Sequence, residues 1–275
     1  MFGVTTSLGL GTVQISAGMA HIFDIEETFT NKVYIIIFIT LLGLTSVSLG
    51  LNAGIKKLSQ LNMIIATGLL LLVFILGPTI FIVNALVQNF GAYLNTIIQS
   101  ATWTEVYDPS SWQNGWTLFY FTWWFSWAPF VSLFIARISY GRTVKEFIVG
   151  VLFVPSLIVF LWMGVFGNAA IYQVISDTSD ISQVVANNLP VALFTLYDVY
   201  PFAKALSIVS LILIITFFVT SSDSGALVAS MLSSKDQSDI NDDSPMISRV
   251  TWAVLLGIVA AVLLYAGGLT ALQTS

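Results

Sequence analysis

The sequence contains no cysteine and a single histidine, His21. Without cysteine the chain forms neither disulfides nor thiolate metal sites, and one histidine provides no metal-ligand spacing, so we interpret His21 as incidental. Charged residues make up only 8% of the chain, against about 25% in a typical soluble domain, which excludes a soluble globular protein. The formal net charge of −5 is small and scattered, which argues against a nucleic-acid partner.

Long apolar runs are what the chain has in abundance. It is 57% hydrophobic and has a mean hydropathy of +0.91. A membrane-spanning helix needs about 20 predominantly apolar residues, and the runs do not alternate as strands do. Seven segments are long enough, namely Phe2–Phe23, Val33–Ala53, Leu61–Leu86, Trp116–Ser139, Phe147–Tyr172, Ala205–Ser233 and Ile247–Leu269. The sequence therefore predicts an all-α integral membrane protein.

The loops between these segments predict an orientation. Basic residues in short loops stay on the cytoplasmic side. One set of alternate loops holds seven Lys and Arg residues and the other holds two; the first set is Lys56, Lys57, Arg137, Arg142, Lys145, Lys235 and Arg249, and the second is Lys32 and Lys204. We therefore expect the loops near Lys56, Arg142 and Lys235 to be cytoplasmic and Val87–Gly115 to be external. Within the external loop, Phe90–Ala101 is too short to span and is predicted to lie along the membrane surface.

An aromatic stripe runs along the segment WTLFYFTWWFSWAPFVSLF. At 100° per residue, six rings fall within about 40° of one line; they are Trp116, Tyr120, Trp123, Trp127, Phe130 and Phe134. Trp124 stands at the edge of this stripe. Aromatic belts place Trp at helix ends, whereas this stripe continues through the helix interior. Two interpretations stay open, a cation–π cage for a quaternary ammonium group and an aromatic packing face. Pro129 removes a backbone donor and frees a carbonyl near Phe125, as in helices that line transporter sites.

A second group of polar residues lies in TFFVTSSDSGALVAS, Thr216 to Ser230. Phe217, Thr220, Ser221 and Ser224 share one helical face. Adjacent hydroxyls one turn after a carbonyl provide the hard oxygen ligands that a small cation such as Na⁺ prefers. The alternative is that the hydroxyls bond to their own helix or to a neighbouring helix.

Asp223 is an ionisable residue within this apolar segment and is therefore a candidate functional residue. It lies on a different face from the hydroxyls, and pairing with Arg137 or Arg142 is the structural alternative. The glycines of SLGLGTVQISAG, Ser7 to Gly18, do not form a phosphate loop, because no strand precedes them and no Lys-Ser/Thr pair follows. They are predicted to allow close contact between helices.

The stretch WTLFYFTWWFSWAPFVSLFIARISYGRTVKEF, Trp116 to Phe147, closely resembles the signature of the betaine/choline/carnitine transporter (BCCT) family, and SLGLGTVQISAG and FFVTSSDSG resemble further family segments. The resemblance implies a LeuT-like fold of two inverted repeats of five helices. Residues 2–86 then correspond to the last three helices of the first repeat. Residues 87–115 form the external loop, and residues 116–269 form the first four helices of the second repeat. With abrupt ends and an odd number of helices, the chain is expected to be a fragment of a larger transporter.

The resemblance also implies roles for individual residues. Trp123, Trp124 and Trp127 match the aromatic box, with Trp124 and Trp127 nearest to the ammonium group of the substrate. Phe130 and Phe134 match aromatic residues that line the inner pathway. Arg137 and Arg142 match the arginines of the motif. Thr220 and Ser221, with the Phe217 carbonyl, match a sodium site. Met63 replaces the arginine of sodium-independent exchangers, which favours sodium. Val4 replaces a threonine linked to a second ion, and Phe121 replaces a tryptophan found in some members.

We therefore expect secondary active uptake of glycine betaine, or of choline or carnitine, coupled to Na⁺, without catalysis and without an organic cofactor. The resemblance further implies a homotrimer embedded in the lipid bilayer. The alternatives are a sodium-independent or proton-coupled choline or carnitine transporter or exchanger. A remote alternative is an intramembrane aspartyl protease that uses Asp198 and Asp223, although no Gly-x-Gly-Asp motif is present. A passive channel is disfavoured, because a tryptophan cage retains its ligand.

Overall fold

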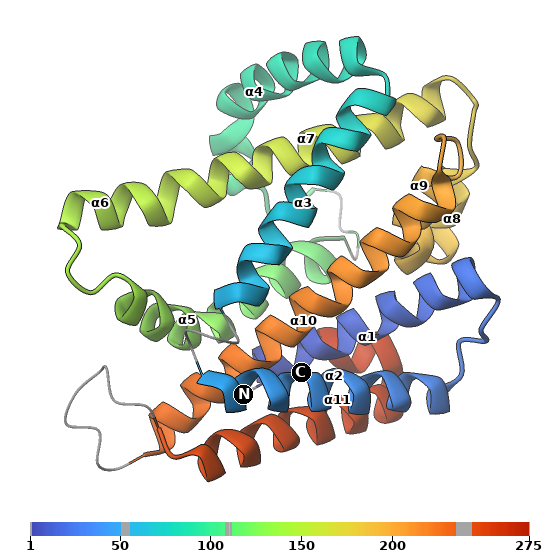
Figure 1. The fold of residues 1–275 in the computed structure, drawn as a ribbon. Coiled ribbons are helices and arrows are strands. Elements are labelled where there is room, and N and C mark those ends of the chain that lie inside the picture. Colours follow the sequence, from blue (N-terminus) through green and yellow to red (C-terminus); the bar gives the residue numbers. More distant parts are fainter. Residues whose placement is uncertain (1, 51–55, 108–109, 111, 235–243, 275) are drawn as a thin grey trace. The chain divides into compact units, whose positions relative to one another are not determined.

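The computed structural model describes residues 2–50, 56–107, 110, 112–234 and 244–274, without the side chains of 2, 47–50, 137 and 268–274. Within these ranges the regular elements are helices (Figure 1). They are α1 (Phe2–Phe23), α2 (Phe29–Gly50), α3 (Lys56–Leu76), α4 (Thr79–Ala101), η2 (Asn114–Leu118), α5 (Phe119–Ile138), α6 (Val144–Ile148), η3 (Val149–Phe153), α7 (Val154–Ile175), α8 (Ile181–Asn187), η4 (Leu189–Val191), α9 (Ala192–Tyr197), α10 (Ala203–Ser233) and α11 (Met246–Thr274). The predicted all-α architecture is confirmed for this part of the chain.

Most predicted segments coincide with helices. The first has the bounds of α1, and the last two differ from α10 and α11 by a few residues. The segment from Phe147 contains a short π-helical stretch, η3, and the segment from Trp116 overlaps another, η2, which begins two residues earlier; uniform apolar periodicity reveals neither. The end of the predicted segment Val33–Ala53 and the loop at Lys235 lie outside the described residues.

The predicted spanning segment Leu61–Leu86 is wrong, because the helix ends at Leu76 and a new helix begins at Thr79 (Figure 1). Pro78 has no backbone N–H and disfavours helical geometry at Gly77. Thr79 Oγ1 donates to the carbonyl of Phe74 at 2.7 Å, which joins the two helix ends across the break. The predicted surface helix Phe90–Ala101 is likewise too short, since it is the second half of α4.

Seven helices of the described chain are long and apolar enough to cross a membrane, but they are not the seven predicted segments. Helix α4 is included, whereas α1 is not. Five polar side chains of α1 are buried, namely Thr5, Thr6, Ser7, Thr12 and Ser16. A helix that packs against other helices needs no lipid-compatible surface, so its mean hydropathy falls. The crossing of the bilayer by Phe2–Phe23 stays a prediction.

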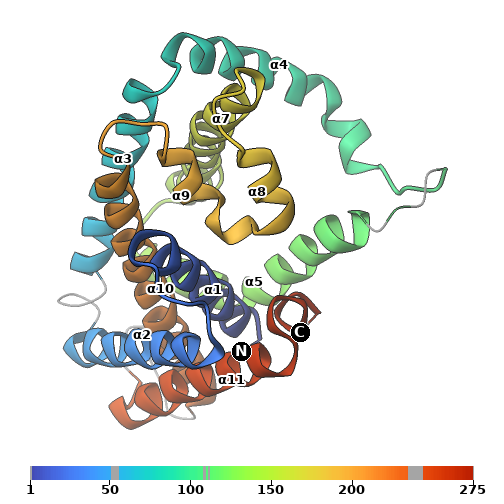
Figure 2. The ribbon, with the colours of Figure 1, turned by 90° about the vertical axis from the view of Figure 1, so that its right-hand side faces the viewer.

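The described chain divides into two compact units. The first comprises Met1–Ile64, Asn114–Tyr140 and Val209–Ser275, and the second comprises Ile65–Gln113 and Gly141–Ile208. In the first unit α1 packs against both α2 and α11, and these helices lie side by side (Figures 1 and 2). Apolar side chains such as Leu8, Ile39 and Leu256 are almost completely buried there.

Close helix contact in the first unit depends on glycine. A Cβ at Gly11 of α1 would overlap the ring of Phe218 on α10. A Cβ at Gly257 of α11 would lie 2.7 Å from Thr40 Oγ1 on α2. These contacts confirm, for Gly11, the prediction that the glycines of α1 permit helices to approach closely.

In the second unit α4 packs against α7, and the short helices α8 and α9 lie beside one another (Figure 2). Gln173 of α7 donates through Nε2 to the carbonyl of Leu196 on α9 at 2.9 Å, which holds α9 against α7. Tyr200 is buried next to Gly77, where an added Cβ would lie 3.0 Å from its hydroxyl oxygen. Burial raises the pKa of Tyr200, so its phenol stays neutral.

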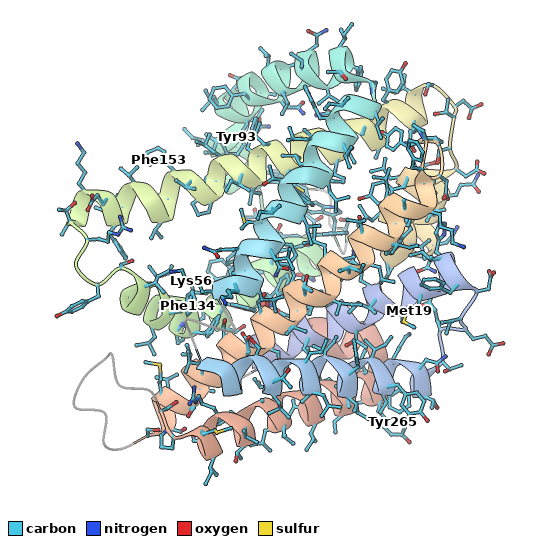
Figure 3. All side chains as sticks on the ribbon, viewed as in Figure 1. Met19, Lys56, Tyr93, Phe134, Phe153 and Tyr265 are labelled. Carbon is cyan, nitrogen blue, oxygen red and sulfur yellow. The ribbon has the colours of Figure 1, made fainter. Side chains whose placement is uncertain are left out.

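Both units carry exposed apolar side chains. Tyr93 on α4 and Phe153 on η3 project from the ribbon in Figure 3, with exposed fractions of 55% and 61%. Many neighbours on α4 and α7 are exposed in the same way, among them Leu94, Ile98 and Leu157. Surfaces of this composition suit a bilayer rather than water.

The first prediction concerns the contact between α1 and α10. Gly11→Ala is expected to lower the free energy of unfolding by about 1–3 kcal/mol, because the added methyl group overlaps the Phe218 ring. Gly68→Ala on α3 is the matched control, since nothing lies within 4 Å of its added Cβ. The control is expected to be neutral or to stabilise by about 0.5–1 kcal/mol. Thermal unfolding in detergent compares them, and equal effects of the two substitutions would contradict this account.

Candidate functional site

The aromatic stripe forms a series of ring contacts along η2 and α5. Trp116 stacks on Tyr120 with the two ring centroids 6.2 Å apart, and the centroid of Tyr120 lies 5.8 Å from that of Trp123. Further along the helix, the centroids of Trp127 and Phe130 are 5.0 Å apart. Phe130 then stacks on Phe134 at 6.3 Å. The predicted shared face is therefore confirmed, even though Trp116 lies in the π-helical turn.

Two tryptophans of this stripe converge on one turn of α1. The indole N–H of Trp127 contacts the carbonyl oxygen of Gly3 at 2.9 Å and the hydroxyl oxygen of Ser7 at 3.1 Å. The indole N–H of Trp123 contacts the same two oxygens at 3.3 and 3.2 Å. Ser7 in turn donates its hydroxyl hydrogen to the Gly3 carbonyl at 3.0 Å. Both indoles are consequently fixed in orientation by α1.

Gly3 makes this convergence possible. A Cβ at Gly3 would lie 2.5 Å from Ser126 Oγ and 2.9 Å from Trp127 Cδ1. Any other residue would force α5 away from α1 and lengthen both indole hydrogen bonds. Gly3 and Ser7 are functional candidates that the sequence interpretation missed. The signal for them is the small-residue character of α1, which by itself indicates close helix packing.

Trp124 has a different environment from its two neighbours. It lies at the edge of the stripe and is 69% exposed in the described structure, whereas Trp123 and Trp127 are half-buried against α1. Tyr120 is 43% exposed. The structure therefore brings Trp123 and Trp127 together through α1 and leaves the indole of Trp124 accessible. Whether these rings form a cage or only pack stays a prediction.

Thr220, one of the hydroxyl residues of α10, bonds to its own helix, which was one of the two alternatives for these residues. Thr220 donates its hydroxyl hydrogen to the carbonyl of Phe217 at 2.8 Å. Ser221 is the next residue and is half-buried. The side-chain amide nitrogen of Asn62 on α3 donates to Thr220 Oγ1 at 3.5 Å. Oxygen atoms from a carbonyl and a hydroxyl thus lie together, which is the donor type that suits a small hard cation such as Na⁺.

One further observation fits such a cation at this position. Asn62 Oδ1 is buried and has no hydrogen-bond partner among the described residues. Met63, the neighbouring residue, is 47% exposed and uncharged. No group of three or more His, Cys, Asp or Glu side chains that could bind a transition metal occurs in the described part of the chain.

Asp223 follows these hydroxyls on α10 and is completely buried. Ser46 of α2 contacts its Oδ2 at 2.5 Å, and Ser224 contacts its Oδ1 at 3.3 Å. Gly43, one turn before Ser46, also faces α10, where an added Cβ would make an ordinary contact with Ser222 Oγ at 3.6 Å. Asp223 therefore joins α10 to α2. The described contacts of Asp223 are with hydroxyls. The alternative of pairing with Arg137 or Arg142 stays a prediction, because the side chain of Arg137 lies outside the described part of the chain.

Comparison with known proteins places these features in a family. The family described as BCCT, betaine/carnitine/choline family transporter, matches residues 1–275. The chain is 41% identical over 276 residues to a glycine betaine transporter of Acinetobacter baylyi, which covers 100% of this chain and 41% of the relative. It is 40% identical over 275 residues to the glycine betaine transporter OpuD of Bacillus subtilis, covering 99% of this chain and 52% of the relative.

A high-affinity choline transport protein of Escherichia coli is 38% identical over 276 residues, covering 100% of this chain and 41% of the relative. The chain spans about half the length of the curated relatives it matches. The match to a transporter family argues against the alternative of an intramembrane aspartyl protease. The chain is an all-α membrane protein that belongs to the betaine/carnitine/choline transporter family.

Proposed function

We propose that the protein containing this chain imports a small quaternary-ammonium osmolyte, with glycine betaine as the first candidate and choline or carnitine next. The proposal is supported by relatives named as glycine betaine and choline transporters over essentially the whole chain. It is also supported by the aromatic stripe of α5 and by the oxygen-rich group of α10.

The observation that carries the substrate class is the orientation of Trp123 and Trp127. Their N–H groups already bond to Gly3 and Ser7, so these two indoles have no donor left for a ligand. What remains available is the electron-rich ring surface. A quaternary ammonium group neither donates nor accepts hydrogen bonds, and it binds to aromatic faces by cation–π attraction. The stripe therefore favours such a cation over ligands that need hydrogen bonds.

The proposed driving force is the sodium gradient. The Phe217 carbonyl and the hydroxyls of Thr220 and Ser221 are the proposed ligands, and the neutral Met63 leaves the positive charge to the ion. One Na⁺ that moves inward through 100 mV releases about 2.3 kcal/mol, which corresponds to about fifty-fold accumulation of substrate. Substrate and Na⁺ would enter from outside and leave inside by alternating access around a site near the bilayer midplane.

The proposed orientation places the ends of helices near Lys56 and Arg142 in the cytoplasm and the α1–α2 connection outside. A homotrimer is a further proposal that comes from the family resemblance alone.

The second prediction tests the cage. Trp124→Leu removes an accessible ring and is expected to weaken glycine betaine binding by about thirty-fold, since a desolvated cation–π contact contributes about 2 kcal/mol. Binding of radiolabelled betaine to the complete purified protein measures this. Phe125→Leu is the matched control, because Phe125 is equally exposed on α5 but lies off the stripe. Wild-type affinity in Trp124→Leu would refute the cage.

The third prediction tests sodium coupling. Uptake of betaine by cells that make the complete protein is expected to collapse when Na⁺ is replaced by K⁺. Thr220→Val is expected to raise the Na⁺ concentration for half-maximal uptake about tenfold, because one oxygen ligand to a charged group is lost. Thr216→Val is the control, since its hydroxyl bonds only to carbonyls of its own helix, Ile212 and Leu213. Uptake indifferent to Na⁺ would favour proton coupling or exchange instead.

The fourth prediction tests the orientation. This chain lacks cysteine, so a single cysteine introduced into it reports its own side of the membrane once any cysteines in the rest of the complete protein have been replaced. Glu26→Cys is expected to react with a membrane-impermeant maleimide in intact cells, and Lys57→Cys only after permeabilisation. Both residues are exposed, so local burial does not limit labelling. The reverse pattern of labelling would invert the proposed orientation.

A further inference from the structure

Asn62 is a buried amide in α3, whose remaining residues are mostly apolar and in part exposed. Only 1% of its surface is accessible, whereas its neighbours Leu61 and Met63 on α3 are each 47% exposed. The side chain therefore points away from the exposed face of α3. It reaches α10, where its Nδ2 donates to Thr220 Oγ1 at 3.5 Å within the same compact unit.

The hydrogen bonds of this amide are incomplete. The contact with Thr220 is at the upper limit for a hydrogen bond and is consequently weak. The other end, Oδ1, is buried and has no hydrogen-bond partner among the described residues. Buried amide oxygens are normally satisfied, and one that is not calls for an explanation such as a bound ion. A purely structural asparagine between two helices would be expected to use its carbonyl as well as its N–H.

We propose that Asn62 provides a further oxygen ligand, Oδ1, to a monovalent cation held at Thr220. The inference rests on the proposed sodium coupling and adds a ligand from a second helix, α3, to a site whose other proposed ligands all lie on α10. A half-turn of the terminal amide exchanges Nδ2 and Oδ1 and brings the carbonyl oxygen to the side of Thr220. The same side chain thus donates to Thr220 when no ion is bound and turns its oxygen toward the ion when one is bound.

The chemistry of the residue suits this role. An amide oxygen is a hard, neutral ligand, like the Phe217 carbonyl and the Thr220 hydroxyl. The charge and the number of the ligands set the affinity of oxygen sites for cations. Because none of these ligands is a carboxylate, the positive charge of the ion is not neutralised and the ion is bound weakly enough to be released. A half-turn of one amide also requires no displacement of α3 or α10.

The fifth prediction is tested by ion-dependent thermal stability, which reports binding without transport. A ligand that binds only the folded protein stabilises it by RT ln(1 + L/Kd), where L is the free ligand concentration, so a fit of the rise in unfolding temperature against ligand concentration gives Kd, the half-saturating concentration. The complete protein in detergent is titrated with NaCl at constant ionic strength made up with KCl. Asn62→Leu removes the oxygen and is expected to raise the half-saturating Na⁺ concentration about tenfold or more. Asn62→Asp keeps an oxygen and is expected to match or exceed the wild-type response.

Thr216→Val serves as the control on α10 and is expected to respond to Na⁺ like the wild type. Binding of glycine betaine at saturating Na⁺ is measured on every variant, and Asn62→Leu is expected to retain it. A wild-type Na⁺ response in Asn62→Leu, or a weakened one in Asn62→Asp, overturns the role of Asn62 and leaves sodium coupling standing. If the wild-type protein itself binds betaine but gains no stability from Na⁺, sodium coupling and the Asn62 ligand both fail.

Discussion

Two indole N–H groups that share one backbone carbonyl and one hydroxyl are the contact on which the proposed substrate site depends. Trp123 and Trp127 are four residues apart, so both lie on the same side of α5 and reach the same turn of α1. The carbonyl of Gly3 is available there, and the absence of a side chain on Gly3 lets α5 approach. Hydrogen bonds have no competition from water in a lipid environment, which makes this pairing a strong constraint on ring orientation.

Polar contacts of this kind recur across the first compact unit. Ser46 binds Asp223 across α2 and α10, and Trp252 of α11 donates to Ser233 of α10 at 2.9 Å. In each case a polar atom that lipid could not satisfy finds its partner on another helix. Helix association in membranes gains little from apolar burial, so close packing at small residues and such hydrogen bonds take on that role.

The sequence predicted those features that depend on one helix alone. The bounds of α1, the shared face of the aromatic stripe and the grouping of Phe217 with Thr220 follow from local periodicity, and the structure confirms them. The break at Gly77 and Pro78 was present in the sequence as a turn signal. Apolar residues continue on both sides of it, so hydropathy hid the end of α3.

Features that depend on two distant helices could not be predicted in this way. Ser46 and Asp223 are 177 positions apart, and Asn62 and Thr220 are 158 apart. One sequence gives no sign of which buried hydroxyl or amide will meet which partner. The contact of Asp223 with Ser46 was missed for this reason, since charge complementarity is only one way to satisfy a buried carboxyl group and a serine hydroxyl is another.

Helix α1 links the two candidate sites physically. Near its start, Gly3 and Ser7 hold the indoles of α5, and two turns later Gly11 lies against Phe218, next to the proposed ion ligand Phe217. The intervening backbone is a continuous helix, which is stiff along its axis. Any displacement of α1 relative to α10 would therefore also move the acceptors that orient Trp123 and Trp127. A helix with buried threonines and serines, which is not among the candidate membrane spans of the described chain, is thus the element through which ion and substrate sites are able to affect one another.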